Sequence, residues 1–387
     1  MKVLINALAS KAGGGITYLK NLLEYISNNE IGLDITVLLS SVYQGQFVSK
    51  EYRNVKKWVV RMPRSAALMV LWEQTILPLL LWKGHYDVIF NPCNFTQLLT
   101  PIKDVIVVSN LNIHSIGKMK ANNRLPITFK LFCQYILANL SLLKAKWVIY
   151  PTRTAYKEVE ESVLGKLGDN YSIIPYGVNK EVFSNADNIK DNSKGKEKFT
   201  IIYVSNFAEH KNHAKLIDAF LLISQKGIKS QLILIGDINA NKAKKKWCRN
   251  KIYRDYSSEL FRIATEEDII LTGHVENDGL PKYYKMADMF AFPSLRESFG
   301  HPIVEAMSCG LPIAISDLPY AHEICGDAAV YFDPLNPKDI ADKIIEVLLN
   351  DELRESLIRK SLERAKLFSW ERCFSETLRV IESVAAK

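Results

Sequence analysis

The fold can be predicted from one segment, Met289-Phe290-Ala291-Phe292-Pro293-Ser294-Leu295-Arg296-Glu297-Ser298-Phe299-Gly300-His301-Pro302-Ile303-Val304-Glu305-Ala306-Met307. It begins as a short apolar strand, continues as a polar loop and ends as a helix, which is the repeating unit of a parallel α/β sheet. Pro302 suits the first position of the helix, where its missing N–H group costs nothing, and His301 then falls near the N-cap. Gly300 gives the backbone freedom just before that helix.

The same alternation of short strands and amphipathic helices extends along the whole chain. In the first half we expect helices at 16–27 and 127–143 and strands at 3–6, 35–39, 88–90, 105–109 and 147–150. After a polar segment at 185–198, which is typical of a linker, a second series begins. It has a helix at 211–225, a largely helical end from Pro337 onward, and strands at 199–204, 231–235, 269–272, 289–291, 312–315 and 329–332.

Length and composition indicate two globular domains in a reducing compartment. The chain has 387 residues, of which 48% are apolar and 24% charged, so extensive disorder is not expected. Six scattered cysteines without a Cys-x-x-Cys pair argue against a disulfide framework and a zinc site. The N-terminus resembles a first strand rather than a signal peptide, and we expect a cytoplasmic protein. The most apolar segment, 66–82, is interrupted by Glu73, Gln74 and Pro78, and predicts one or two core or interfacial helices rather than a membrane span.

The formal charge of +8 favours an anionic partner. Residues 239–254 hold seven Lys or Arg and no Asp or Glu, which is typical of a solvated helix face or of a contact with anionic lipid or acceptor. No nucleic-acid-binding motif accompanies this charge, so nucleic acid is not an expected partner.

Polar loops after three predicted strands are the candidate sites, because parallel sheets bind ligands at the carboxyl ends of their strands. Gly13, Gly14 and Gly15 open a helix after the first strand, so they form either a flexible turn or a backbone contact to phosphate or acceptor. This loop fits neither the dinucleotide fingerprint nor a P-loop. Lys211 begins a helix after the strand at 199–204 and is a candidate point charge for phosphate, although a lone lysine is a weak signal.

The third loop, in the segment quoted above, is the most informative. Ser298, Phe299 and Gly300 are placed to direct N–H groups at an anion beside the positive end of the helix. Glu297 should stay in the loop and Glu305 should fall in the first helical turn, so that both carboxylates line one pocket at different depths. A carboxylate binds phosphate poorly but accepts hydrogen bonds well from hydroxyl groups. The pattern therefore points to a ligand with phosphates in the middle and a hydroxylated ring on each side, which is a nucleotide sugar. The alternative is a capped helix with glutamates that only complement its dipole.

On these residues the chain resembles the retaining family 4 glycosyltransferases of the GT-B fold. Their signature of two glutamates separated by seven residues corresponds to Glu297 and Glu305, within the run from 293 to 312. Further segments also fit the family: Ser316-Asp317, Glu323, Phe332-Asp333-Pro334, Thr272-Gly273-His274-Val275, and Ile174-Pro175-Tyr176-Gly177-Val178-Asn179 with Phe183.

The resemblance implies two Rossmann-like domains that face each other across a cleft. It places an acceptor-binding domain at 1–180, joined by a returning C-terminal helix at 370–387, and a nucleotide-sugar-binding domain at 181–369. It implies that Lys211 binds the donor diphosphate, that Glu305 holds the ribose hydroxyls and that Glu297 lies near the transferred sugar. The other residues it assigns to the donor are Ser298, Phe299, Gly300, Gly14, Gly15, Asn206 and His274.

Two departures from the family pattern bear on the site. Ser205-Asn206 stands where the family often has Gly-Arg, so one charge partner of the diphosphate is missing or supplied elsewhere. The segment from Ser109 to His114 lacks the aspartate of the family's His-Asp pair. His114 is therefore either a sugar-contacting, catalytic residue or an ordinary loop histidine.

The implied activity is transfer of a hexose from a nucleotide-diphosphate sugar to a glycan or lipid-linked acceptor, with retention of anomeric configuration, in surface polysaccharide synthesis. No Asp-x-Asp follows a strand, so no metal is expected, and the donor is a substrate rather than a cofactor. Peripheral contact with the inner face of the plasma membrane would use Trp58, Trp72 and Trp82, unless these tryptophans are core residues. The alternatives are a sugar-nucleotide 2-epimerase and a non-catalytic nucleotide-sugar-binding subunit.

Overall fold

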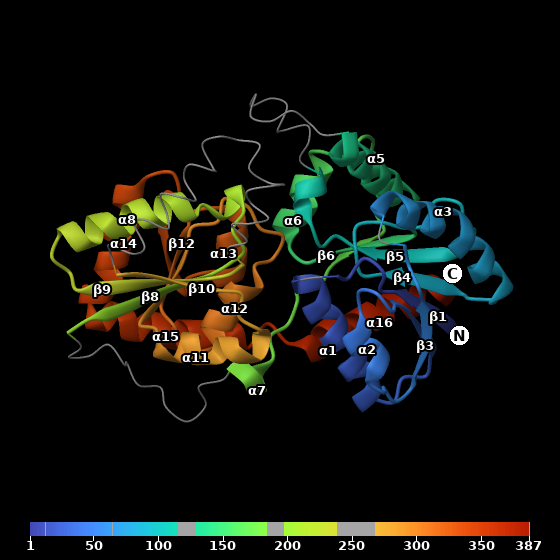
Figure 1. Cartoon of the computed structure of the whole chain (residues 1–387), viewed down its shortest axis with the longest axis horizontal. Coiled ribbons are helices and arrows are strands. Elements are labelled where there is room, and N and C mark those ends of the chain that lie inside the picture. Colours follow the sequence, from blue (N-terminus) through green and yellow to red (C-terminus); the bar gives the residue numbers. More distant parts are fainter. Residues whose placement is uncertain (12, 64, 115–128, 184–196, 238–267, 387) are drawn as a thin grey trace. The chain divides into compact units, whose positions relative to one another are not determined.

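The chain forms two compact units, Met1–Gly177 with Ser369–Lys387 (unit 1) and Val178–Phe368 (unit 2) (Figure 1). The computed structural model describes residues 1–11, 13–63, 65–114, 129–183, 197–237 and 268–386. The basic stretch 239–254 and most of the predicted linker at 185–198 therefore lie outside the described residues.

Unit 1 is built on a parallel sheet of seven strands in the order β3-β2-β1-β4-β5-β6-β7. The strands are β1 (Lys2–Asn6), β2 (Asp34–Ser40), β3 (Val55–Val60), β4 (Val88–Asn91), β5 (Lys103–Val107), β6 (Trp147–Tyr150) and β7 (Tyr171–Ile173). The helical segments are α1 (Gly14–Asn28), α2 (Gly45–Ser49), α3 (Ala66–Lys83), η1 (Leu111–His114), α5 (Phe129–Lys144), α6 (Arg153–Glu160) and α16 (Trp370–Ala386). The five predicted strands are confirmed, while the two edge strands, β3 and β7, were not predicted.

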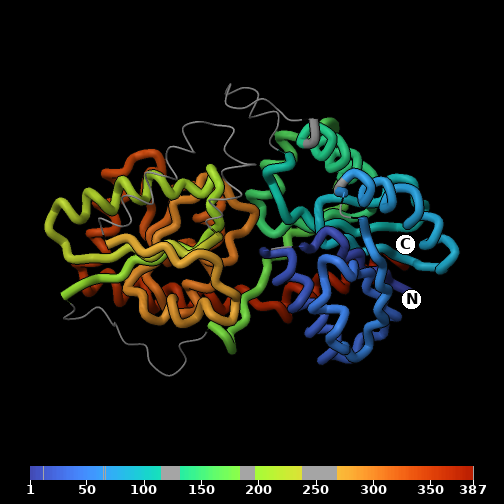
Figure 2. The backbone as a smooth tube through the Cα atoms, viewed as in Figure 1, coloured from blue at the N-terminus to red at the C-terminus, as the bar shows by residue number. Residues whose placement is uncertain are grey.

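The C-terminal helix α16 belongs to unit 1, as the resemblance implied. Figure 2 shows this red segment returning beside the blue N-terminal part of the chain. Aromatic rings of α16 and α1 pack together, with ring centroids 5.1 Å apart for Trp370 and Phe374 and 5.2 Å apart for Tyr18 and Phe374. The backbone approaches closely at Gly177, where an added Cβ would lie 2.1 Å from the nitrogen of Trp370. Only glycine fits there.

The segment at 66–82 forms one helix, α3, with Pro78 inside it. Met69, Leu77 and Leu81 face the core of unit 1. Trp58 and Trp72 are half-buried and pack against that core, which favours the core alternative for these two, whereas Trp82 is exposed. Within the described part of the chain, no helix has the length and apolarity to cross a bilayer. Sequence spacing alone does not distinguish the two faces of a helix that is apolar almost all round.

Unit 2 contains a parallel sheet of six strands in the order β10-β9-β8-β11-β12-β13. The strands are β8 (Phe199–Val204), β9 (Ser230–Ile235), β10 (Ile269–Gly273), β11 (Met289–Phe292), β12 (Ile313–Ser316) and β13 (Ala329–Phe332), and all six were predicted. The helical segments are α7 (Lys180–Phe183), η2 (Glu209–Lys211), α8 (His213–Gln225), η4 (Asn277–Gly279), α11 (Leu280–Met286), α12 (His301–Ser308), α13 (Pro319–Cys325), α14 (Pro337–Leu349) and α15 (Asp351–Ala365).

Both sheets reverse their strand order beside their first strand, and in open parallel sheets ligands usually bind at the carboxyl ends of the strands at such a point. In unit 2, β8 lies between β9 and β11, so the loops after β8 and β11 meet there. These two loops carry Lys211 and Glu297. The fold thus brings together residues that are 86 positions apart in the sequence.

Candidate active site

The loop after β11 turns into α12 through a left-handed residue. Gly300 caps the helix with φ 84° and ψ 63°, a conformation that favours glycine. The helix begins at His301 with Pro302 second, one residue from the predicted start. Glu305 is therefore the fifth helical residue, and its predicted place in the first turn is wrong because that turn ends at Val304.

An ion pair joins the two loops. The Nζ atom of Lys211 lies 2.5 Å from Oε1 of Glu297, and only 16% and 10% of the two side chains are exposed. Lys211 ends the short η2 turn, and the predicted single helix from 211 to 225 is instead this turn followed by α8. A largely buried ammonium group and carboxylate thus stand side by side at the carboxyl ends of β8 and β11.

Asn212 fixes the backbone next to Lys211, and the sequence analysis missed it. Its φ of 57° and ψ of 34° lie in the left-handed region, which breaks the helix and which asparagine tolerates better than most residues. Its buried side-chain amide donates hydrogen bonds to the carbonyl oxygens of Pro293, at 3.2 Å, and Pro334, at 2.7 Å. The Tyr203 hydroxyl donates to the Lys211 carbonyl at 2.8 Å.

Backbone hydrogen bonds connect the same loops a second time. The amide of Leu295 donates to the carbonyl of His210 at 2.7 Å, and the Ser294 hydroxyl donates to that carbonyl at 3.3 Å. The Tyr320 hydroxyl donates to the Ser294 carbonyl at 2.7 Å. The position of Glu297 relative to Lys211 is therefore set by buried polar contacts from α13 and from the loop after β8.

Three histidines lie in or beside the loops after β8 and β11, and all three have a pKa well below 7. Burial and, to a smaller extent, the nearby Lys211 together lower the pKa of His210 to about 4 and that of His213 to about 3. Burial also lowers the pKa of His301 to about 4. These three imidazoles are therefore not cations at neutral pH. That Lys211 binds a phosphate stays a prediction.

Glu305 has a different environment from Glu297. Its Oε2 accepts a hydrogen bond of 2.8 Å from the hydroxyl of the fully buried Tyr284. Burial raises the pKa of Glu305 to about 7, while the hydrogen bond from Tyr284 opposes the rise. The Glu297 carboxylate thus pairs with the ammonium group of Lys211, whereas the Glu305 carboxyl group is hydrogen-bonded to the neutral hydroxyl of Tyr284. That both line one pocket stays a prediction.

The remaining predicted residues of unit 2 take varied positions. The Phe299 side chain is buried against Phe368, with ring centroids 5.7 Å apart, so only its backbone is available to a ligand. Ser298 is half-buried in the same loop. Asn206 is exposed just after β8, and His274 is exposed after β10, with Nε2 3.3 Å from a carboxylate oxygen of Glu276.

In unit 1 the predicted glycines open α1, which begins at Gly14. The glycine that the backbone requires is Gly13, whose φ is 56°. A Cβ on Gly15 would meet the Cα of Ser10 at 3.5 Å, an ordinary contact, and so would fit. The roles of Gly14 and Gly15 stay predictions.

His114 is buried at the end of η1, beyond the carboxyl end of β5. Its Nε2 lies 2.9 Å from the side-chain nitrogen of Asn94. Because that amide nitrogen can only donate, Nε2 accepts and the neutral ring carries its proton on Nδ1. The Oδ1 of Asn94 in turn accepts from the backbone of Ser109 and Asn110.

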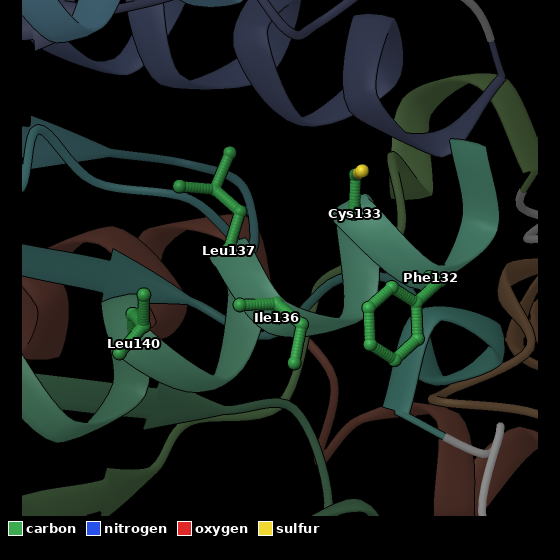
Figure 3. Close-up of a pocket in the computed structure, with 5 residues that line it drawn as sticks. All are labelled: Phe132, Cys133, Ile136, Leu137 and Leu140. Atoms are coloured by element: carbon green, nitrogen blue, oxygen red, sulfur yellow. The ribbon is translucent and has the colours of Figure 1, made fainter. Parts of the chain in front are cut away.

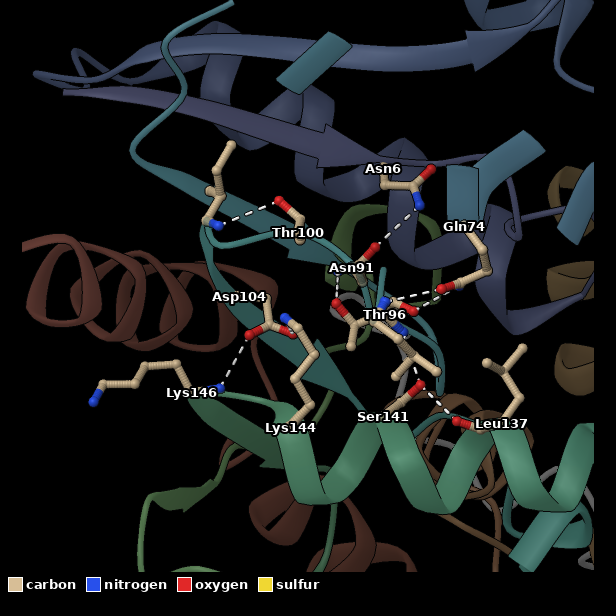
Figure 4. Close-up of polar contacts among 12 residues, drawn as sticks. Asn6, Gln74, Asn91, Thr96, Thr100, Asp104, Leu137, Ser141, Lys144 and Lys146 are labelled. Carbon is tan, nitrogen blue, oxygen red and sulfur yellow. Dashed lines mark hydrogen bonds and ion pairs between the residues drawn. The ribbon is translucent and has the colours of Figure 1, made fainter. Parts of the chain in front are cut away.

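A buried polar cluster that the sequence did not reveal lies at the carboxyl ends of β1 and β4 (Figure 4). The side-chain nitrogen of Asn6 donates to Oδ1 of Asn91 at 3.0 Å and to Oε2 of Glu73 at 3.1 Å. Asn91 donates to the Thr96 hydroxyl at 3.3 Å. Glu73, which interrupts an apolar helix in the sequence, points toward the sheet, and burial raises its pKa.

Comparisons with known proteins identify a family of similar sequences. Residues 184–364 match the family model described as "Glycosyl transferases group 1". The O-antigen chain mannosyltransferase B of Escherichia coli is 32% identical over 183 residues, which cover 46% of this chain and 44% of that protein. The Phosphatidyl-myo-inositol mannosyltransferase of Mycobacterium tuberculosis (strain H37Rv) is 28% identical, covering 57% and 56%. The chain thus spans about half the length of these relatives.

A longer match has lower identity. The capsular polysaccharide biosynthesis glycosyltransferase CapM of Staphylococcus aureus is 25% identical over 82% of both chains. Among solved structures, sucrose-phosphate synthase from Thermosynechococcus elongatus has a TM-score of 0.74 at 16% identity, covering 100% of this chain and 99% of that one. Anabaena Alr3699/HepE in complex with UDP and glucose has a TM-score of 0.73 at 17% identity, covering 99% and 100%. These structures show the fold alone.

Proposed function

This chain belongs to the group 1 glycosyl transferases, with the GT-B fold, and from that premise we propose that it transfers a sugar from a nucleotide-diphosphate donor with retention of configuration. The observation that carries the proposal is the pair of Lys211 and Glu297 at the carboxyl ends of β8 and β11. A cation and a carboxylate at that place suit a ligand that joins a diphosphate to a hydroxylated ring.

The donor diphosphate binds at Lys211 and at the N-terminus of α12. The ammonium group stabilises the charge that grows on the diphosphate as it leaves, the electrostatic term that usually dominates such catalysis. The backbone N–H groups of Ser298, Phe299 and Gly300 lie in the loop that leads into the positive end of this helix and contribute to binding the diphosphate. The Glu305 carboxylate accepts hydrogen bonds from the ribose hydroxyls, and the Glu297 carboxylate accepts hydrogen bonds from hydroxyls of the transferred sugar.

The chemical step needs no protein nucleophile in this proposal. The bond between the anomeric carbon and the donor phosphate oxygen breaks, and the acceptor oxygen bonds to the same carbon from the same face. The acceptor proton passes to the departing β-phosphate. The chain supplies orientation and charge stabilisation, and Lys211 lowers the energy of the dianionic product. The reaction is proposed to need no divalent cation.

The acceptor is proposed to be a glycan or a lipid-linked glycan of a surface polysaccharide, bound by unit 1, while unit 2 binds the donor. Relatives named for O-antigen, capsular polysaccharide and phosphatidyl-myo-inositol support this class. The five described cysteines are free, which supports a reducing compartment and hence reaction in the cytoplasm.

The test is turnover of UDP-, GDP- and ADP-sugars, with NMR to assign the anomeric configuration of the product. Release of the nucleoside diphosphate with a retained linkage, unchanged by EDTA, supports the proposal. A new sugar isomer would identify an epimerase, and binding without turnover would identify a non-catalytic subunit.

The variant that tests the site is Lys211→Ala, which should lower kcat/KM by about 10²- to 10³-fold. The matched control is Lys215→Ala, because Lys215 is a more exposed lysine of α8 that pairs with Asp218 and not with Glu297. An unchanged kcat/KM in Lys211→Ala would refute the role of this lysine.

A further inference from the structure

Tyr284 of α11 contacts the carboxyl group that is proposed to hold the donor ribose. Figure 1 shows α11 beside α12 within unit 2, and the Tyr284 hydroxyl joins the two helices. This hydroxyl donates to Oε2 of Glu305 at 2.8 Å and lies 3.4 Å from the carbonyl oxygen of Pro302, in the first turn of α12. A hydroxyl has only one proton to donate, and the shorter contact is the one with Glu305.

The ring of Tyr284 is fixed by the core of unit 2. The residue is fully buried, with 0% of its surface exposed. Its ring packs edge-on against Phe183 of α7, with centroids 5.8 Å apart, and lies 5.9 Å from the ring of Phe290 in β11. Because a close-packed core leaves such a ring little freedom, the hydroxyl points in one direction, toward Glu305.

The carboxyl group of Glu305, in contrast, is open to a ligand on one side. The residue is half-buried. Among the described residues Tyr284 is the hydrogen-bond donor to this carboxyl group, and it reaches Oε2 alone. A carboxylate has about four acceptor positions, so Oε1 and part of Oε2 stay available to hydroxyl groups. A glutamate side chain that is held in this way loses less rotamer freedom when a ligand binds than a mobile one does.

A groove along α5 in unit 1 shows what a ribose would miss without such a group. This groove has a volume of about 280 Å³, and it is lined by Phe132, Cys133, Ile136, Leu137 and Leu140 (Figure 3). Ribose hydroxyls placed against these apolar side chains and one thiol would lose hydrogen bonds to water without replacement. A carboxylate that a buried hydroxyl holds in place, as in unit 2, provides that replacement.

We propose that Tyr284 is a positioning residue, whose hydroxyl orients the Glu305 carboxylate toward the donor ribose and thereby makes the site prefer ribonucleotides to 2′-deoxyribonucleotides. This inference rests on the proposed function, since it takes the ligand of Glu305 to be that ribose. A hydrogen-bonding group that is fixed in place rejects an analogue without the matching hydroxyl, because the group is then left without its partner. Tyr284 acts through Glu305 and needs no contact with the donor.

The test is calorimetric binding of GDP, UDP and ADP, and of their 2′-deoxy forms, to the full chain at pH 8. We expect the original chain to bind one ribonucleotide at least about tenfold more tightly than its 2′-deoxy form. Tyr284→Phe keeps the buried ring and removes the hydroxyl, so it should weaken binding of that ribonucleotide by about tenfold and binding of the 2′-deoxy form much less. Tyr283→Phe is the matched control, because Tyr283 is the half-buried neighbour whose ring lies 5.0 Å from Nζ of Lys282, and it should bind both forms like the original chain.

A double variant separates positioning from packing. Because the hydroxyl acts through the carboxylate, Glu305→Gln/Tyr284→Phe should bind the ribonucleotide within about threefold of Glu305→Gln alone. Losses of the two single variants that multiply in the double variant would overturn the inference, as would equal weakening of both nucleotide forms by Tyr284→Phe. Far-ultraviolet circular dichroism checks folding. If Tyr284→Phe does not fold, Glu305→Gln decides, and a preference for the ribonucleotide that survives in it would overturn the inference.

Turnover of the nucleotide sugars, measured in parallel on the original chain, separates this inference from the proposed function. The expected loss of preference in Tyr284→Phe without any turnover would leave the inference standing and remove the proposed transfer. Turnover with an unchanged preference in Tyr284→Phe would do the reverse. If the original chain binds none of the nucleotides, both are overturned.

Discussion

Replacing Glu305 by glutamine should make the protein more stable and its donor binding weaker. The rise of the Glu305 pKa from 4.5 to about 7 means that the folded chain holds this proton more tightly than the unfolded chain. Between these pH values the native state binds more protons, so stability is lost as the pH rises through about 7. The loss is at most on the order of 3 kcal/mol, because the side chain is half-buried and keeps some contact with water.

Glutamine has no charge to bury, so Glu305→Gln should remove this cost. At pH 8 the variant should exceed the original chain in stability by up to a few kcal/mol, less whatever the altered hydrogen bond with Tyr284 costs. At pH 5 the folded protein still holds the Glu305 proton but the unfolded chain has lost most of it, so the difference should fall to about 1 kcal/mol or less. Thermal and urea unfolding at both pH values measure it, with Glu276→Gln, at an exposed glutamate, as control.

Donor binding should move in the opposite direction. A carboxylate accepts two ribose hydroxyls more strongly than an amide, so calorimetry should show weaker binding by Glu305→Gln at pH 8. For the original chain, affinity should fall as the pH drops below 7 and the carboxylate becomes protonated. An equal change in stability at pH 5 and pH 8, or unchanged donor affinity in the variant, would refute the reasoning.

Two further substitutions probe the scaffold. Asn212→Ala loses two buried hydrogen bonds and strains a left-handed backbone, so it should lower the free energy of unfolding by about 3 kcal/mol. Asn212→Gly loses the same hydrogen bonds but keeps the backbone conformation, so it should lower that free energy by less. Equal losses of both variants in urea unfolding would contradict this explanation. Gly177→Ala should destabilise unit 1 by about 3 kcal/mol or more, because its Cβ would overlap the Trp370 backbone. Gly168→Ala, which meets nothing within 4 Å, should leave the melting temperature unchanged, and similar melting temperatures for both would reject the explanation.

The strands that the sequence predicted are short apolar runs, most of them largely buried. β8 and β13 were predicted to the residue because each is a short apolar run between polar turns. β3 was missed because two lysines interrupt it, and β7 because it has only three residues. β10 and β13 are also edge strands and were predicted, because each keeps an apolar run. A strand is therefore missed when its apolar run is broken or very short, wherever it lies in the sheet.

The site could be predicted as separate loops but not as a connected structure. Lys211 and Glu297 were both named from the sequence, yet their contact depends on β11 pairing with β8, which no local pattern encodes. The left-handed backbone of Asn212 depends on partners up to 122 positions away. Glu73 was treated as an interruption of an apolar segment because its partner, Asn6, lies 67 positions away.

The resting pair of Lys211 and Glu297 restricts which ligands can enter the site. Both groups are largely buried, so leaving either charge without a partner would cost about 3–5 kcal/mol. Inorganic phosphate would satisfy the ammonium group but would place a second anion beside Glu297. A sugar alone would donate hydrogen bonds to the Glu297 carboxylate but would give the ammonium group of Lys211 no negative charge to pair with. Only a ligand that joins an anion to a set of hydroxyl donors at close range satisfies both groups at once. If the site binds a nucleotide sugar as proposed, the pair selects for the intact linkage between sugar and diphosphate, and this selection is lost when the linkage breaks.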